Sequence, residues 1–343
     1  MKSIILQKPY TFQYQEVDFD STLSDNEVLL KIHAIGICGT DYHAYKGNQP
    51  FFSYPRCLGH ELGAEIVAIG TNVDVGKYAI GSRVSVEPYL HCGTCQACRS
   101  RKMNCCENLQ VLGVHIDGGM TEFIKVPATK VHISKHLSFE QLALIETLAI
   151  GCHAVNRAEI KTDDIVLVIG SGPIGLSVIE FARLKCATIF VMDRDENRLA
   201  FCNAHYDVKT ILKTENDLDL QFYMPEKPTI VFDATGNENS MNETVRMVAN
   251  GGKIVFVGLH QGNIVFKDTD FHRREVTLLA SRNALPSDFE FIIQKVEEGT
   301  IDTSKWITHR THFDTLMESF GSWLDPKNKV IKAVVSLQPA TNN

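Results

Sequence analysis

Long hydrophobic runs, an excess of basic residues and internal repeats are all missing from this sequence of 343 residues. Without a run of about 20 apolar residues, no transmembrane helix is predicted. The apolar stretch within Met1–Lys8 is too short for a signal peptide, so we expect a cytoplasmic protein. The net charge of −7 argues against nucleic-acid binding, because proteins that bind nucleic acids usually carry a basic excess.

The remaining composition is that of an ordinary globular protein. A hydrophobic fraction of 44% and a charged fraction of 22% exclude wholesale disorder, and the length suggests about two domains. Cysteine, by contrast, is plentiful, and half of the 10 cysteines fall between residues 92 and 106. Disulfides are rare in a reducing cytosol, so this cluster indicates metal or redox chemistry.

The chain changes character along its length. Its first 130 residues are rich in short β-branched segments, such as 28–33 and 64–69, which predict strands. Ser138 and Gln141 have the spacing of a capping box, which predicts a helix over 138–157. Apolar strands then alternate with helices, and the alternation predicts a parallel sheet covered on both faces, with strands at 165–169, 188–192, 229–233, 253–257 and 276–280.

Four cysteines have the spacing C-x2-C-x2-C-x7-C, namely Cys92, Cys95, Cys98 and Cys106. A closed shell of four thiolates suits Zn²⁺ at about 2.3 Å and leaves no position for a substrate, so the site would be structural. An iron–sulfur cluster and a group of buried free thiols are the alternatives, although ferredoxin-type runs end in C-x3-C-P. Cys105 could take the place of Cys106.

A second set of residues could form an open metal site. Cys38 directly precedes a glycine, and His60 and Glu61 follow another. Three protein ligands of these types leave a fourth position on Zn²⁺ for water or substrate. Each residue taken alone is more often structural, and spacing does not decide between the two interpretations.

A G-x-G-x-x-G pattern directly follows the strand expected at 165–169 and opens an apolar helix. Such a loop binds the pyrophosphate of a dinucleotide at the start of the helix, here through Gly170, Gly172, Pro173, Ile174 and Gly175. Asp193 ends the next strand, where a carboxylate binds the ribose hydroxyls and repels a 2′-phosphate. NAD is therefore favoured over NADP, although the neighbouring Arg194 could accept that phosphate.

Together these motifs resemble the zinc-dependent medium-chain alcohol and polyol dehydrogenases over essentially the whole chain. The resemblance implies an α/β protein with two domains. A β-rich GroES-like catalytic domain would occupy 1–150, completed by 287–343, and a Rossmann NAD-binding domain with a doubly wound parallel sheet would occupy 151–286. The segments 47–56, 111–115 and 281–284 are similar to the bacterial branch that oxidises the hexonate L-galactonate to a keto-sugar acid.

The resemblance also assigns roles to individual residues. Cys38, His60 and Glu61 match the ligands of the catalytic zinc, and Glu146 matches a further carboxylate that binds this zinc or its water. Asp41 matches a residue that orients the zinc-bound histidine, and Thr40 and His43 match the proton relay. Further residues match the cofactor-binding segments, namely Arg198, Thr235, Val257, Gly258, Leu259, Ser281 and Arg282.

The expected reaction is hydride transfer from a secondary hydroxyl of the sugar acid to NAD. A hexonate carboxylate needs a cation, and Arg56 and Arg282 are candidates, unless Arg282 binds the cofactor phosphate. His115 is another candidate polar contact. Neutral polyols such as sorbitol, polyol phosphates and L-threonine are alternative substrates, and a dinucleotide sensor without catalysis and a redox protein built on the cysteines are alternative classes. By analogy with the family we expect a homo-oligomer, either a dimer or a tetramer.

Overall fold

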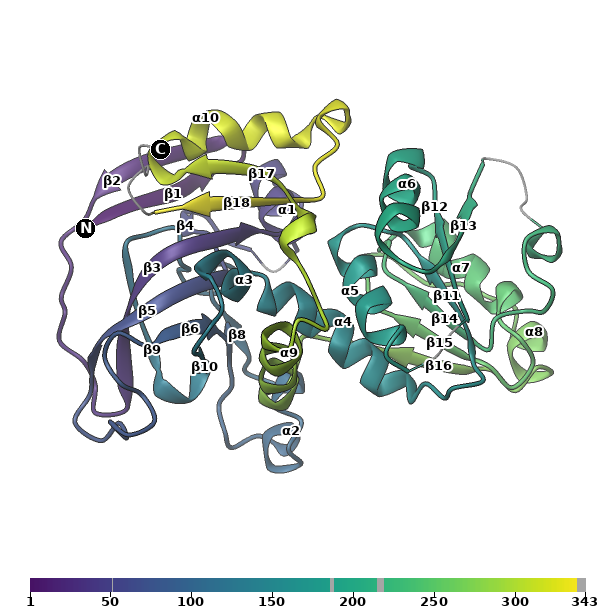
Figure 1. Ribbon diagram of the computed structural model, residues 1–343, viewed down its shortest axis with the longest axis horizontal. Coiled ribbons are helices and arrows are strands. Elements are labelled where there is room, and N and C mark those ends of the chain that lie inside the picture. Colours follow the sequence, from purple (N-terminus) through teal and green to yellow (C-terminus); the bar gives the residue numbers. More distant parts are fainter. Residues whose placement is uncertain (51, 186–187, 215–218, 338–343) are drawn as a thin grey trace. The chain divides into compact units, whose positions relative to one another are not determined.

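The computed structural model describes residues 1–50, 52–185, 188–214 and 219–337 (Figure 1). The chain divides into two compact units, Met1–Glu146 with Leu285–Asn343, and Thr147–Ala284. Their boundaries lie slightly before the domain boundaries expected from the sequence. No helix in the described part of the chain is long and apolar enough to cross a membrane.

The first unit is built mainly from strands. Its largest sheet has the order β10-β6-β5-β3-β18-β17 with β9 beside β3, where the strands are β3 (Glu27–Ile37), β5 (Glu61–Ile69), β6 (Arg83–Val86), β9 (Phe123–Pro127), β10 (Val131–Ser134), β17 (Ile307–His312) and β18 (Lys332–Ser336). Smaller sheets are formed by β1 (Lys2–Lys8), β2 (Thr11–Glu16) and β4 (Arg56–Cys57), and by β7 (Tyr89–Leu90) and β8 (Gln110–Val111). Its helices are α1 (Gly39–Lys46), α2 (Gln96–Arg99), α3 (Phe139–Ala143), α9 (Pro286–Glu297) and α10 (Leu316–Phe320).

The C-terminal segment completes the sheet of the first unit. Strand β18 lies between β3 and β17, and Ala333 pairs with Ile37 at the end of β3 (Figure 1). This antiparallel register brings the buried Lys332 next to the point where β3 ends and the segment with Cys38 begins.

The helix expected over 138–157 is in fact two helices, so this prediction was wrong in its continuity. The capping box is present, because the Ser138 hydroxyl accepts a hydrogen bond from the Gln141 N–H at 3.2 Å and the Gln141 side chain accepts one from the Ser138 N–H at 2.9 Å. Helix α3 ends at Ala143, where the N–H of Leu144 is shared between two carbonyls, as is common at helix ends. Helix α4 (Ile145–Ala158) then begins anew, which places Glu146 in its first turn.

The second unit contains a doubly wound sheet. Six parallel strands in its described part have the order β13-β12-β11-β14-β15-β16, with helices on both faces (Figure 1). They are β11 (Ile165–Ile169), β12 (Thr188–Asp193), β13 (Lys209–Leu212), β14 (Ile230–Asp233), β15 (Lys253–Phe256) and β16 (Thr277–Ala280). The helices are α5 (Pro173–Ala182), α6 (Glu196–His205), α7 (Glu238–Met247) and α8 (Asp268–His272).

The five strands expected in this unit are confirmed to within a residue at each end, whereas β13 was not predicted. The central strands are buried on both faces, which explains their continuous apolar sequences. Leu167, Phe190 and Val231 from three neighbouring strands share one core. Cys186, which the sequence leaves without assigned chemistry, lies outside the described residues.

Candidate metal and nucleotide sites

Three predicted ligands converge in the first unit. Cys38 is the N-cap of α1, and His60 and Glu61 lie at the start of β5. The Cys38 sulfur, a nitrogen of His60 and a carboxylate oxygen of Glu61 all lie within 4.8 Å of one another. His60 is 5% exposed and Glu61 fully buried. One thiolate, one imidazole and one carboxylate form a donor set that Zn²⁺ accepts, so the group fits a zinc ion.

The local backbone explains why these side chains meet. The Cys38 N–H donates to Asp41 Oδ2 at 2.9 Å, and this bond fixes the start of α1. Gly36 pairs with Glu61 across β3 and β5, and a Cβ at Gly36 would collide with the Glu61 carboxylate. The glycine therefore makes room for the acidic side chain.

Glu61 has a buried cationic partner that sequence reasoning missed. Lys332 Nζ lies 2.7 Å from both carboxylate oxygens of Glu61 and also donates to the Ile37 carbonyl at 3.2 Å. Burial opposes the charge of Lys332, but the anionic Glu61 and Cys38 raise the pKa of the lysine above its ordinary value. A lysine followed by the apolar run 333–335 is the only sequence signal that could have pointed to this buried ion pair.

Glu146 is held by a second residue that the sequence analysis did not select. The Tyr89 hydroxyl donates a hydrogen bond to Glu146 Oε1, and both side chains are buried. Burial raises the pKa of Glu146, and nearby Glu61 raises it further. Glu146 does not belong to the compact group of Cys38, His60 and Glu61, so its place as a ligand stays a prediction.

Asp41 faces His60 as expected, but at a distance too long for a hydrogen bond. His60 Nδ1 lies 3.7 Å from Asp41 Oδ1, and neither buried atom has a hydrogen-bond partner in the described residues. Burial alone would lower the pKa of His60, but the surrounding anionic groups, Asp41 and Cys38 foremost, raise it well above its usual value. A divalent cation would relieve this excess of acidic groups.

The expected proton-relay residues both lie on α1. Thr40 is partly buried in the first turn of the helix, and His43 is exposed. The Nδ1 atom of His43 lies 3.0 Å from the side-chain oxygen of Asn48. The two residues therefore lead from the metal group toward solvent along one helix.

The two polar side chains proposed for substrate contact in this unit both interact with other residues of the protein. The Arg56 guanidinium lies 3.4 Å from Asp117 and donates to Ser53 at 3.1 Å. The Nδ1 atom of His115 accepts a hydrogen bond from the Val111 N–H at 3.1 Å, which is the role of a loop residue. Their assignment to the substrate stays a prediction.

The predicted cysteine cluster also comes together. The sulfurs of Cys92, Cys95, Cys98 and Cys106 all lie within 4.8 Å of one another, whereas Cys105 is exposed and outside the group. Hydrogen bonds, first among them one from the Thr94 N–H, lower the pKa of Cys92 to about 5. Four converging thiols, one of them already a thiolate at neutral pH, fit a closed structural zinc site.

The glycine-rich loop lines a cavity of about 270 Å³ in the second unit, together with the ends of β12 and β14. Gly170, Gly172, Asp193, Arg194, Arg198 and Thr235 are among its lining residues. A Cβ at Gly175 would collide with the Gly170 carbonyl, so the third glycine is needed for the close approach of helix and strand. The geometry is that of a dinucleotide-binding loop.

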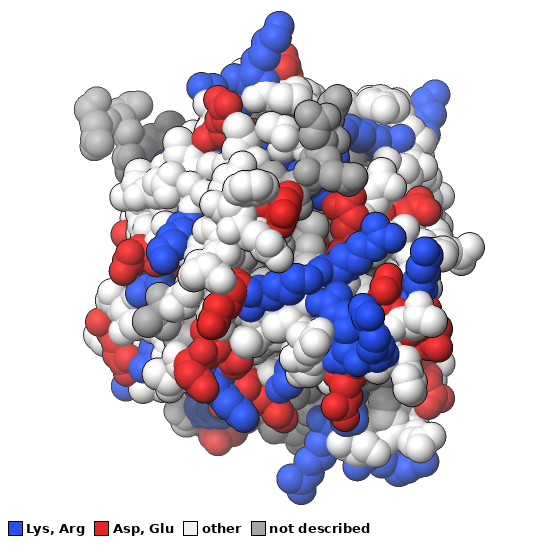
Figure 2. All heavy atoms as spheres, turned by 90° about the vertical axis from the view of Figure 1, so that its right-hand side faces the viewer, with Lys and Arg blue, Asp and Glu red and all other residues white. Residues whose placement is uncertain are grey.

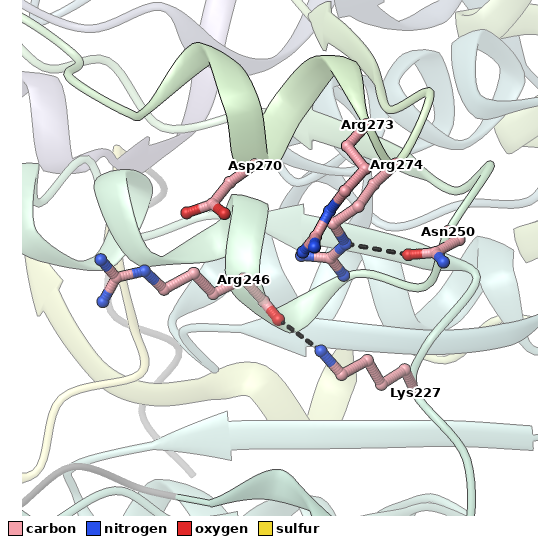
Figure 3. A pocket seen from close by; sticks show the side chains of 6 residues that line it. All are labelled: Lys227, Arg246, Asn250, Asp270, Arg273 and Arg274. Carbon is pink, nitrogen blue, oxygen red and sulfur yellow. Dashed lines mark hydrogen bonds between the residues drawn. The ribbon is translucent and has the colours of Figure 1, made fainter.

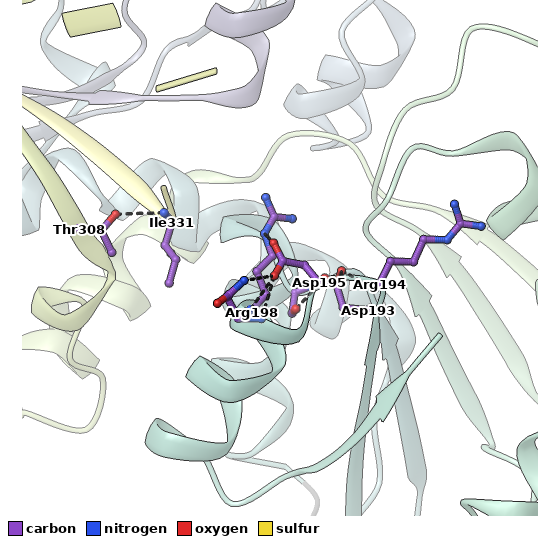
Figure 4. A network of polar contacts seen from close by, with 8 residues as sticks. Asp193, Arg194, Asp195, Arg198, Thr308 and Ile331 are labelled. Carbon is purple, nitrogen blue, oxygen red and sulfur yellow. Dashed lines mark hydrogen bonds and ion pairs between the residues drawn. The ribbon is translucent and has the colours of Figure 1, made fainter. Parts of the chain in front are cut away.

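Asp193 organises the edge of this cavity (Figure 4). Its Oδ2 accepts hydrogen bonds from the Ser171 N–H at 2.6 Å and the Ser171 hydroxyl at 2.7 Å. Its Oδ1 accepts from the N–H groups of Arg194 and Asp195 at 2.7 and 3.0 Å. The carboxylate thereby ties the glycine-rich loop to the end of β12.

The other predicted cofactor residues lie at the neighbouring strand ends. Thr235 donates to Asp233 through its N–H and hydroxyl, and the N–H groups of Val257 and Gly258 bond to the Asp233 carbonyl. Leu259 is 61% exposed. The remaining two predicted cofactor residues follow β16. Arg282 is exposed, whereas the buried Ser281 hydroxyl has no hydrogen-bond partner in the described residues.

Comparison with known proteins identifies the class. Residues 24–135 match the alcohol dehydrogenase GroES-like domains, and residues 173–298 match the zinc-binding dehydrogenases. The chain belongs to the zinc-type alcohol dehydrogenase family, and it is an oxidoreductase that acts on CH–OH groups of small molecules. It is 40% identical over 339 residues to L-galactonate-5-dehydrogenase of Escherichia coli strain K12. This alignment covers 98% of this chain and 99% of that relative.

Two further relatives show the breadth of the family. Sorbitol dehydrogenase of Bacillus subtilis strain 168 is 30% identical over 327 residues, or 91% of each chain. The solved structure of the alcohol dehydrogenase RspB from Escherichia coli CFT073, complexed with NADH, superposes with a TM-score of 0.90 at 31% identity, covering 98% of this chain and 99% of that one. The predicted combination of a GroES-like and a Rossmann fold is thus confirmed.

Proposed function

We propose that this protein is a zinc-dependent dehydrogenase that transfers hydride from a secondary hydroxyl of an L-galactonate-like hexonate to NAD. The observation that carries the proposal is the convergence of the partly buried Cys38 with the buried His60 and Glu61 in a chain 40% identical to an L-galactonate-5-dehydrogenase. That relative's name supplies the substrate class, and the donor set supplies the chemistry.

The chain's own residues would divide the work around the metal. Cys38, His60 and Glu61 would hold a catalytic zinc, with Glu146 as a further carboxylate for the zinc or its water. Bound zinc lowers the pKa of a coordinated hydroxyl, which makes its deprotonation accessible at neutral pH. The Thr40 hydroxyl would accept the substrate proton as it passes its own proton on toward His43, which is exposed and would release a proton to solvent.

The second unit would bind NAD. The N–H groups at the start of α5 would bind the pyrophosphate, and Asp193 and Arg198 would lie at the adenosine end. Thr235, Val257, Gly258, Leu259 and Ser281 would line the rest of the dinucleotide, and Arg282 would bind either the cofactor or the substrate carboxylate. The RspB structure complexed with NADH supports this choice of cofactor. The four cysteines would hold a second, structural zinc and so stabilise the loop between β7 and β8.

The test is a substrate panel with purified, zinc-loaded protein. NADH formation is followed with NAD and L-galactonate, other aldonates, sorbitol, polyol phosphates and L-threonine. We expect the highest kcat/KM with L-galactonate and loss of turnover in Cys38→Ser. The matched control is Cys57→Ser, a buried cysteine outside both metal groups. Turnover of sorbitol but of no aldonate would refute the substrate class.

A neutral polyol is the second candidate substrate. It is favoured by the 30% identity to sorbitol dehydrogenase and by the engagement of Arg56 with Asp117. If the substrate is a hexonate, Arg282→Gln should raise the KM for L-galactonate without changing the KM for sorbitol. An equal change for both substrates would assign Arg282 to the cofactor.

A further inference from the structure

A second cavity of the Thr147–Ala284 unit lies apart from the nucleotide loop. Its volume is about 780 Å³, within the range of small-molecule sites, and no lining residue is shared with the nucleotide cavity. It is lined by Lys227, Arg246, Asn250, Asp270, Arg273 and Arg274 (Figure 3). Four cations against one carboxylate leave a formal charge of +3 (4 − 1) in a protein whose net charge is −7.

Arg274 is the buried part of this lining. It is 8% exposed, and its guanidinium donates to Asn250 Oδ1 at 3.0 Å and to the carbonyls of Val245 and Val248. These acceptors fix the side chain at the end of α7, but all three are neutral. Among the described residues no carboxylate forms an ion pair with this guanidinium; burial and the neighbouring Arg273 lower the pKa of Arg274, and the more distant Asp270 offsets only part of that effect.

The other cations lack acidic partners as well. The Arg273 guanidinium lies beside that of Arg274 in Figure 3 and forms no hydrogen bond or ion pair with any described residue. Lys227 donates to the neutral Arg246 carbonyl at 2.9 Å; burial and the nearby Arg274 lower its pKa, against a smaller opposing effect of Asp219. The Arg246 side chain is directed toward the far end of the cavity, near Asp270 (Figure 3).

Figure 2 shows lysine and arginine side chains gathered in a band across one face of the molecule, with aspartate and glutamate side chains beside it. Asp270 is the one carboxylate in the lining, and it forms no ion pair with any described residue. It therefore leaves the arginines available to a ligand, although it would repel one placed close to its own end of the cavity.

The geometry points to a binding site for a small multivalent oxyanion, one that carries two or more phosphate or carboxylate groups. Arginine guanidinium groups bind such groups through paired hydrogen bonds, and Arg273 is free to do so beside the fixed charge of Arg274. The site shares no residue with the proposed zinc ligands, and its occupancy does not depend on the proposed reaction. Pyrophosphate and citrate serve as probes that distinguish a ligand with phosphate groups from a ligand with carboxylate groups.

The test is calorimetric titration of the full chain with pyrophosphate and, separately, with citrate. We expect one site per chain, occupied by one of the two anions, with an affinity that falls as salt is added. Arg273→Gln should weaken binding roughly tenfold, the loss of one charge-assisted contact. It should leave NADH formation unchanged, because the arginine touches neither proposed site. Lys227→Gln should weaken binding too, whereas the matched control Lys161→Gln, on the same unit but outside the cavity, should not.

Several outcomes would overturn the site. They are no saturable binding of either anion, equal affinity in Arg273→Gln and the parent protein, or competition with NAD for the same stoichiometric site. Conversion of an oligomer into monomers by Arg273→Gln, measured by sedimentation, would show instead that the cavity contacts a second copy of the chain. Each outcome can be read whether or not L-galactonate is a substrate.

Discussion

Replacing Lys332 with methionine should destabilise the metal-stripped protein far more than an ordinary lysine substitution. The ammonium and the Glu61 carboxylate are 1% and 0% exposed and 2.7 Å apart, so solvent does not screen them. Removing one partner of such a pair leaves a buried charge without compensation, at a cost of about 3–5 kcal/mol. Because anions raise the pKa of Lys332, its stabilising effect is complete below the ordinary lysine value of 10.5 and is lost only as pH rises through the higher folded-state pKa.

The chain has two tryptophans, Trp306 and Trp323, and both are buried in the first unit, so tryptophan fluorescence reports the unfolding of that unit. Urea unfolding followed by their fluorescence therefore reports the free energy of the unit that holds the pair. The control is Lys295→Met, which breaks a partly exposed ion pair with Glu298 and should cost about 1 kcal/mol or less.

The double variant Glu61→Gln with Lys332→Met should be less unstable than the sum of the two single variants, because neither charge is then left alone. A cost for Lys332→Met no larger than that of Lys295→Met would refute the assignment of this ion pair as buried and unscreened.

Three further predictions concern the two proposed zinc sites and the nucleotide loop. Tyr89→Phe removes the hydrogen-bond donor to the buried Glu146 and should weaken binding of the catalytic zinc roughly 10–100-fold, measured by competition titration with a chelator. The control Tyr42→Phe should leave zinc binding unchanged, because the Tyr42 hydroxyl has no hydrogen-bond partner in the described residues. In metal-stripped protein, Cys92 should be alkylated at pH 7 because its pKa is about 5, and labelling should fall as the pH drops through that value. Zinc should protect Cys92 but not Cys105 from alkylation, as measured by peptide mass spectrometry. Gly175→Ala should abolish saturable NAD binding in a fluorescence titration, because the methyl group collides with the Gly170 carbonyl; an unchanged affinity would contradict the assigned role of this loop.

Much of the second unit follows from local sequence. Continuous apolar segments form buried parallel strands because both faces of the sheet are covered, and the G-x-G-x-x-G pattern fixes the turn after β11. The cysteine cluster is similarly local, because Cys92 and Cys106 are close in sequence and in space. Strand β13 escaped prediction because its four residues are only partly apolar and only one of them is buried.

The contacts that the sequence does not reveal are those between distant segments. Lys332 donates to the Ile37 carbonyl, 295 positions away in the sequence, because β18 pairs with β3. The residues around Lys332 do not predict the register of that pairing. Tyr89 reaches Glu146 across 57 positions, and only because a new helix begins at Ile145. The capping box predicts where α3 starts, but no proline or glycine marks the break at the fully buried Leu144.

The central claim is that zinc held by Cys38 and its neighbours enables oxidation of a hexonate by NAD. The most direct measurement is the rate of NADH formation from L-galactonate while metal-stripped protein is titrated with zinc. The account predicts no turnover without zinc, recovery in the parent protein and in Cys105→Ser, and no recovery in Cys38→Ser at any zinc concentration. Full activity in the stripped protein, or full recovery in Cys38→Ser, would contradict it.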